Sequence, residues 1–102
     1  MAVTCTGEDR VLTLHISGEV DHHGAGKLMT EMDAQMETRF PKTLTLDLSG
    51  VTFMDSSGIA VLLRAYKRMS AVGGSLTVTG VPPQAERVLK AAGLYRLLHF
   101  LE

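Results

Sequence analysis

The sequence has few cysteines, no excess of basic residues and no long apolar run. It holds one cysteine, Cys5, so it forms no internal disulfide and suits a reducing compartment. Its 10 Lys and Arg residues against 11 Asp and Glu give a net charge of −1, without the basic excess that binds nucleic-acid phosphates. Its longest apolar run, at residues 59–63, is far shorter than the ~20 residues of a bilayer helix, and no secretion signal is present. We therefore expect a cytoplasmic protein that contacts neither nucleic acid nor a membrane directly.

The residues that are present suffice for one compact domain. Of the 102 residues, 45% are apolar, and a chain of this length forms a single core. Alternating apolar residues predict strands, and apolar residues three or four positions apart predict helices. The predicted strands fall at residues 2–6, 11–16, 44–48, 76–78 and 97–101, and the predicted helices at 25–36, 59–69 and 85–92. Because helices separate most strands, residues 1–102 should form one α/β domain, with a mixed, mostly parallel sheet flanked by helices in the order β-β-α-β-α-β-α-β.

Small and turn-forming residues set the expected ends of these elements. Ser17-Gly18 should end the second strand, and Ser49-Gly50 should end the third, so that residues 51–54 form a connection. Asp21 lies just before the first helix, where a carboxylate can accept hydrogen bonds from free N–H groups. Pro83 suits the first position of the third helix. The first two strands are expected to pair as an antiparallel hairpin.

The segment Asp55-Ser56-Ser57-Gly58 is the most informative stretch, because it lies where the second helix begins. One interpretation is a simple helix cap, since Asp, Ser and Gly are common in that place. The other is that a serine hydroxyl stands exposed at the helix N-terminus. A phosphate added there would face free N–H groups and the positive end of the helix dipole. It would also lie beside the Asp55 carboxylate, so phosphorylation would change the surface charge without requiring a new fold.

Metal binding and hydrolysis are the other chemistries to consider. His22 and His23 are adjacent, but neighbouring side chains point in different directions and no further ligand lies at a suitable spacing. We therefore expect no metal and no cofactor. Ser56, His22 and Asp21 include the residue types of a hydrolase triad, but the Gly-x-Ser-x-Gly elbow and a Gly-rich phosphate loop are missing. The sequence therefore does not predict an enzyme, and no catalytic residue is assigned.

Two longer segments resemble a known family. Residues 47–59, Asp-Leu-Ser-Gly-Val-Thr-Phe-Met-Asp-Ser-Ser-Gly-Ile, look like the signature of the STAS domain, which sulphate-transporter tails share with anti-sigma factor antagonists. Residues 18–23, Gly-Glu-Val-Asp-His-His, and residues 64–67, Arg-Ala-Tyr-Lys, are similar to the sporulation antagonists of the anti-sigma F factor. The resemblance covers the chain from about Val11 to its end. It implies a small mixed sheet flanked by helices.

The resemblance also implies a mechanism. In these antagonists the serine that follows the motif aspartate is phosphorylated by the anti-sigma factor, which is a serine kinase; here that serine is Ser56, with Ser57 as the alternative. The unphosphorylated antagonist binds the kinase and releases the sigma factor, whereas the phosphorylated form binds poorly until a serine phosphatase resets it. ATP and magnesium belong to the kinase. The residues expected to bind the partner are Asp21, His22, His23, Gly24, Met54, Asp55, Ser57 and Gly58.

Two alternatives remain open at this point. The partner could belong to a general-stress pathway instead of sporulation, although the paired histidines favour sporulation. Alternatively, the chain could be a STAS module that binds a nucleotide, a lipid or a transporter component and is never phosphorylated. The sequence also departs from the sporulation antagonists, which continue into another helix, because it stops at Glu102 soon after the last predicted strand.

Overall fold

A computed structural model of the chain describes residues 2–101 and contains one five-stranded sheet. The strands lie side by side in sequence order, and only the first pair is antiparallel. The mixed, mostly parallel sheet and its initial hairpin are therefore confirmed. The strands are β1 (Ala2–Glu8), β2 (Val11–Val20), β3 (Thr43–Met54), β4 (Ser75–Thr79) and β5 (His99–Leu101), and the helices are α1 (Ala25–Arg39), α2 (Ser57–Ala71), α3 (Pro83–Ala91) and α4 (Leu94–Leu97).

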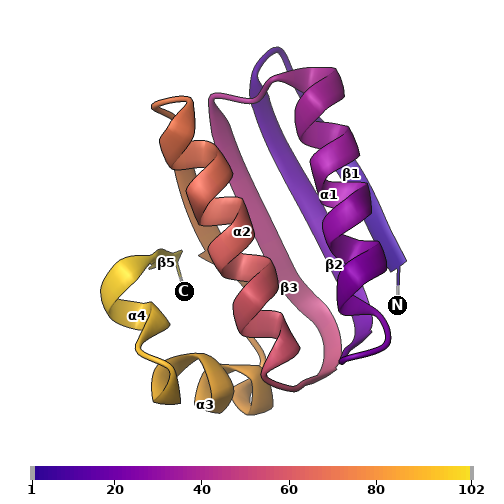
Figure 1. Cartoon of the computed structure of the whole chain (residues 1–102), viewed down its shortest axis with the longest axis vertical. Helices are drawn as coiled ribbons and strands as arrows, with labels where there is room; N and C mark the ends of the chain where they lie inside the picture. The colour runs from indigo at the N-terminus through magenta and orange to yellow at the C-terminus, as the bar shows by residue number, and fades with distance from the viewer. Residues whose placement is uncertain (1, 102) are drawn as a thin grey trace.

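Helices α1 and α2 lie next to each other across one face of the sheet, α3 lies at the end of the sheet where α2 begins and contacts β3, and α4 lies beside β5 (Figure 1). Alternation in the central strands turns their leucines towards these helices, as in Leu14 and Leu46, which are fully buried. The apolar faces of the helices complete the core, for example with Met32 of α1 and Leu62 of α2. None of the helices described is long and apolar enough to cross a membrane.

Strands β2 and β3 are longer than the sequence predicted. Ser17-Gly18 does not end β2, which continues to Val20, and Ser49-Gly50 does not end β3, which continues to Met54. The pairing shifts register between His15 and Ser17 and again between Gly18 and Glu19, so β3 bulges and then resumes its ladder. A Cβ on Gly50 would lie 2.8 Å from the Ser17 Cβ, so the glycine allows this close approach and does not terminate the strand.

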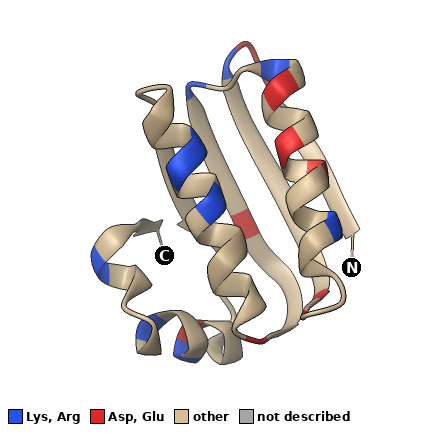
Figure 2. Cartoon of the chain, viewed as in Figure 1, with Lys and Arg blue, Asp and Glu red and all other residues tan. Residues whose placement is uncertain are grey.

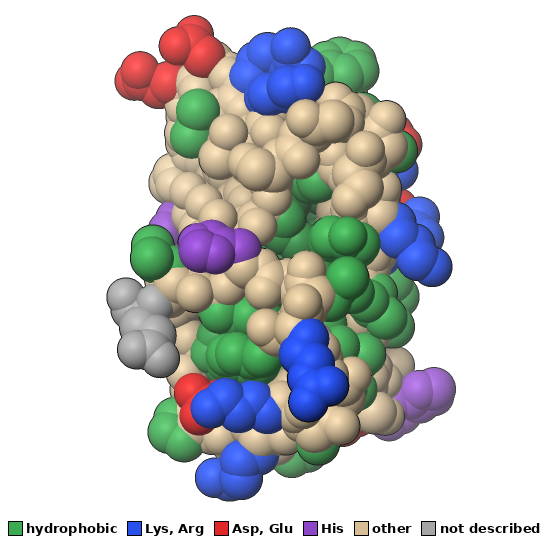
Figure 3. All heavy atoms as spheres, turned by 90° about the vertical axis from the view of Figure 1, so that its left-hand side faces the viewer, with side chains coloured by type: hydrophobic (Ala, Val, Ile, Leu, Met, Phe, Trp, Pro, Cys, Tyr) green, Lys and Arg blue, Asp and Glu red, His purple; other side chains and the backbone are tan. Residues whose placement is uncertain are grey.

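The C-terminal third also differs from the expectation. Residues 94–97 form the additional helix α4, and the last strand begins at His99 instead of residue 97. Gly93 adopts φ +79°, which reverses the chain after α3 and lets Leu94 enter the core. Beside β5, Tyr95 stacks on Phe100 at a ring-centroid distance of 3.8 Å. Hydrophobic side chains gather on this side of the molecule (Figure 3), so this edge of the core is incompletely covered.

Candidate functional site

The ends of β2 and β3 bring the two family-like segments together. Val20 pairs with Met54 at the end of this parallel ladder, and the Asp55 N–H donates to the Val20 carbonyl at 3.2 Å. Both strands therefore end at the same edge of the sheet. From there the chain continues into α1 after β2 and into α2 after β3. Residues 21–24 and residues 55–58, which are more than 30 positions apart in sequence, form one continuous site.

Asp55 holds the two halves of this site in place. Its carboxylate accepts a hydrogen bond from the Ser57 backbone N–H at 2.7 Å and another from the His22 backbone N–H at 3.0 Å. These hydrogen bonds, with that from Ser57 contributing most, hold the pKa of the Asp55 carboxyl below its ordinary value. Asp55 is therefore a charged group at neutral pH, and it ties the start of α2 to the loop before α1.

Asp21 organises the loop that precedes α1. Its side chain accepts a hydrogen bond from the Gly24 N–H at 2.9 Å, and its backbone carbonyl accepts one from the Ala25 N–H at 2.9 Å. The expected capping role is thus partly confirmed, because the carboxylate serves the turn at Gly24 and not a residue inside the helix. A second half-buried carboxylate is therefore fixed in the loop before α1.

Ser56 lies at the N-cap position of α2, but its side chain is not a cap. The residue has helical φ and ψ values of −61° and −17°, and its hydroxyl makes no capping hydrogen bond. Asp55 instead accepts the bond from the start of the helix, so the simple cap interpretation describes Asp55 and not Ser56. Ser56 is exposed, whereas Ser57 is half-buried. The geometry therefore presents the hydroxyl of Ser56, more than that of Ser57, to an approaching molecule.

Met54 and Gly58 lie beneath this surface and not on it. The Met54 side chain is only 1% exposed, and Gly58 is also buried. A Cβ on Gly58 would lie 2.5 Å from the Met54 sulfur, so the glycine lets the helix start close down on that side chain. The expectation of a direct partner contact does not fit the Met54 side chain, whose position suits packing support for the site.

One supporting residue was not anticipated from the sequence. The Gln84 side-chain amide of α3 accepts a hydrogen bond from the Met54 N–H at 2.8 Å and donates one to the Met54 carbonyl at 2.7 Å. This pair substitutes for a neighbouring strand at the end of β3. A lone glutamine thirty positions away carries no recognisable pattern, so sequence reasoning had no means of finding it.

The two histidines are exposed at the edge of the site. The rings of His22 and His23 meet edge to face with centroids 5.7 Å apart, and they do not converge on a common point. Within residues 2–101 no group of three or more His, Cys, Asp or Glu side chains is placed to hold a metal. No hydrogen bond between the His22 ring and Ser56 occurs in the same range, so the triad that was considered is not assembled there.

Known proteins are similar to this chain in sequence and in fold. An anti-sigma F factor antagonist from Paenibacillus polymyxa is 36% identical over 88 residues, which cover 86% of this chain and 75% of that protein. An anti-sigma-B factor antagonist from Staphylococcus aureus is 24% identical over 100 residues, covering 98% and 92% respectively. The fold is similar to that of the Bacillus cell fate determinant SpoIIAA in its phosphorylated form, with a TM-score of 0.74, 20% identity and coverage of 99% and 92%.

The family model agrees with the individual relatives. The STAS domain model matches residues 2–102, which include both segments of the site. The chain therefore belongs to the STAS domain family.

Proposed function

We propose that this protein is an anti-sigma factor antagonist that is switched by phosphorylation of Ser56. Its unphosphorylated form binds an anti-sigma factor and thereby releases a sigma factor. The anti-sigma factor is itself a serine kinase that phosphorylates Ser56, and a serine phosphatase restores the binding form. The observation that carries the proposal is the exposed Ser56, whose hydroxyl makes no cap and which follows the anchored carboxylate of Asp55; the loop that holds Asp21 is tied to the same carboxylate through the His22 N–H.

The relatives support this function. The Paenibacillus protein is named as an antagonist of the anti-sigma F factor, and SpoIIAA is described in a phosphorylated form. STAS proteins of this kind are regulators and not enzymes. In the proposal the antagonist thus supplies the acceptor hydroxyl and the binding surface, while the kinase supplies ATP and magnesium. Such a protein acts in the cytoplasm, where sigma factors and their regulators meet.

The switch follows from local electrostatics. Phosphorylation adds about −1.5 to −2 charge at neutral pH. At Ser56 this charge is next to Asp55 in the chain, and the lowered pKa of Asp55 keeps its carboxylate ionised; the Asp21 carboxylate belongs to the loop bound to Asp55. A partner that covers the site must desolvate these like charges together, and a penalty of only ~1.4 kcal/mol weakens binding tenfold. No large rearrangement is required.

The sporulation sigma F pathway is the favoured setting. Identity to the sigma F relative is 36%, against 24% for the antagonist of the general-stress sigma-B pathway. The general-stress pathway is the second candidate, because that relative aligns with 98% of the chain. A STAS module that is never phosphorylated is the remaining alternative, and the experiment below separates it.

Intact-mass spectrometry tests the proposal. The protein is incubated with its cognate anti-sigma factor, ATP and magnesium, and we expect one added phosphate. Ser56→Ala should abolish the added mass, and the matched control Ser57→Ala should keep it. The reverse pattern would move the site to Ser57, and no phosphate on the wild type would favour the unphosphorylated module.

A further inference from the structure

A shallow hollow lies between α1 and α2, close to Ser56. Its volume is about 580 Å³, it opens to solvent, and residues of both helices line it. Apolar side chains form its floor and cationic side chains form its rim. The lining residues are Met29, Ala60, Leu63, Arg64, Lys67 and Arg68.

The hollow is continuous with Ser56 along one face of α2. Ser56, Ala60, Leu63 and Lys67 follow one another at intervals of four, three and four residues, which places them in a single row on a helix. Ser56, Ala60 and Lys67 are exposed, and Leu63 is half-buried. At 1.5 Å per residue the row is about 16 Å long. We call these four residues the α2 stripe; a molecule that covers Ser56 and extends along the helix must meet it.

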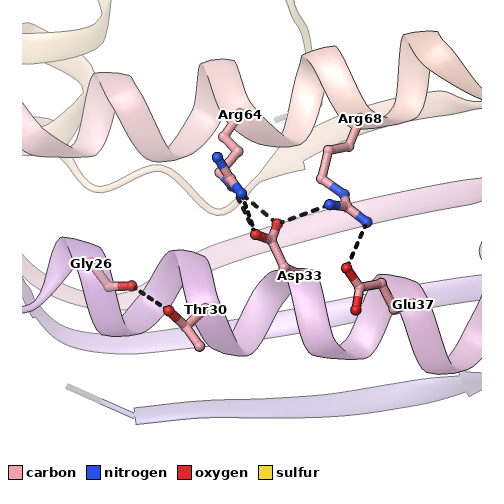
Figure 4. A network of polar contacts seen from close by, with 6 residues as sticks. All are labelled: Gly26, Thr30, Asp33, Glu37, Arg64 and Arg68. Atoms are coloured by element: carbon pink, nitrogen blue, oxygen red, sulfur yellow. Dashed lines mark hydrogen bonds and ion pairs between the residues drawn. The ribbon is translucent and has the colours of Figure 1, made fainter.

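The rim of the hollow carries three cations, and ion pairs with α1 hold two of them in place. The Arg64 Nε donates to the Asp33 carboxylate at 2.9 Å, and Arg68 lies 3.7 Å from the same carboxylate and 3.6 Å from that of Glu37 (Figure 4). The cations of α2 face acidic residues of α1 (Figure 2), but the Asp33 side chain is only 18% exposed beneath them. Lys67 forms no ion pair with any residue between 2 and 101. The Glu37 side chain is 68% exposed and balances Arg68. The charge left for a partner is therefore mainly that of Lys67 and of Arg64, whose carboxylate partner Asp33 lies beneath it.

We propose that the anti-sigma factor continues past Ser56 along the α2 stripe with an acidic, amphipathic segment. An apolar side chain of that segment enters the hollow above Ala60 and Leu63, and its carboxylates lie beside Arg64 and Lys67. An acidic segment is the occupant whose charge complements Arg64 and Lys67. The anti-sigma factor is the partner because the stripe is continuous with Ser56, where that protein is proposed to bind. This inference rests on the proposed function, and it names the chemistry of the partner surface.

The same arrangement couples the stripe to the phosphorylation switch. A phosphate on Ser56 would lie at the N-terminal end of the stripe, and the backbone of Lys67 is about 16 Å further along the helix, about twice the ~8 Å Debye length at physiological salt. The cations of the rim therefore do not neutralise the phosphate. An acidic segment laid along the stripe is instead repelled by the new charge at its end, so one modified residue weakens the whole contact.

Binding of charge-reversed protein to the cognate anti-sigma factor tests the inference. Lys67→Glu should raise the Kd about tenfold or more and should make binding less sensitive to salt. The matched control is Arg96→Glu, which makes the same charge change at an exposed position of α4 without an ion pair in the described structure, and it should bind like the wild type. Ala60→Met fills the hollow without a charge and should also weaken binding, whereas Ala34→Met, at an exposed position of α1, should not.

The outcomes separate this inference from the proposed function. In one outcome the wild type binds and Ser56→Glu does not, while Lys67→Glu and Ala60→Met bind as well as their controls. The stripe is then not part of the interface, so this inference is wrong and the proposed switch at Ser56 holds. If the wild type itself neither binds nor is phosphorylated, both ideas are wrong. Thermal unfolding of each variant identifies any loss of binding that comes from a loss of fold.

Discussion

At the scale of single residues, Asp55 and Ser56 have different roles in the site. Asp55 accepts the hydrogen bonds that a helix start needs, and this leaves the adjacent Ser56 hydroxyl without a structural task. Asp21 does the corresponding work for the loop on the other side. A serine that capped its own helix would have to give up that bond when it was modified. Under the proposed switch, phosphorylation of Ser56 would change the charge and leave the supporting hydrogen bonds of Asp21 and Asp55 intact.

Acid titration tests whether the Asp55 carboxylate binds the His22 and Ser57 amides together. The pKa of its carboxyl is lowered in the folded protein, so the stabilisation is fully present above the unfolded value and is lost as the pH falls through the folded value. We expect the backbone amide signals of His22 and Ser57 to shift together in NMR spectra, with one midpoint below that of an ordinary aspartate. Asp55→Asn should remove the titration and speed hydrogen exchange at both amides. Independent midpoints at the two amides would contradict the account.

At the scale of elements, glycines decide how closely a helix can approach its support. Gly58 in the first turn of α2 is buried against Met54, and an added Cβ would meet that side chain at 2.5 Å. Gly26 in the first turn of α1 has nothing within 4 Å of the place where a Cβ would be. The same residue type therefore has a packing role in one helix and none in the other.

The two glycine-to-alanine substitutions should consequently have opposite effects on stability. Gly26→Ala should raise the free energy of unfolding by about 0.5 kcal/mol, because alanine loses less backbone entropy in a helix. Gly58→Ala should lower it by about 1–3 kcal/mol, because the Met54 side chain must move. Chemical denaturation of both variants gives the comparison. Equal effects of the two changes would show that the start of α2 is not closely packed.

The sequence predicted the order of the elements because their hydrophobic periods are regular. The leucines of β2 and β3 alternate, and the apolar residues of α1 and α2 recur every three or four positions. It did not predict the lengths of β2 and β3, since both strands continue through their Ser-Gly pairs, and the bulges of β3 beside Ser17 and Gly18 depend on the pairing with β2. The helix α4 was missed because one turn is too short to show a period.

The candidate site, like the fold, was predicted only in part from the sequence. The family-like segments named Ser56, Asp55 and Asp21, and the structure brings all three together. The burial of Met54 and the clamp from Gln84 were not predictable, because both depend on how α3 and β3 meet in space. Local patterns thus indicated the candidate serine and its acidic neighbours, and tertiary packing determined which side chains reach the surface.

At the scale of the whole molecule, the two sheet faces have different roles. One face carries the helices and the core, and the other is lined with polar residues that pair across the strands, as in the row Thr13, Thr45 and Thr77. On that face the His15 ring contacts the Asp47 carboxylate at 2.8 Å. The site lies at the edge where β2 and β3 end, supported by the sheet from behind. A rigid support of this kind suits a switch that acts through charge.

The most direct measurement compares the phosphorylated and unphosphorylated protein in two ways, by amide NMR spectra and by Kd for the anti-sigma factor. The account predicts that spectral changes stay within residues 20–24 and 54–60 while the affinity falls at least about tenfold, which corresponds to ~1.4 kcal/mol. Spectral changes spread across the sheet, or an affinity that phosphorylation leaves unaltered, would contradict a local charge switch at Ser56.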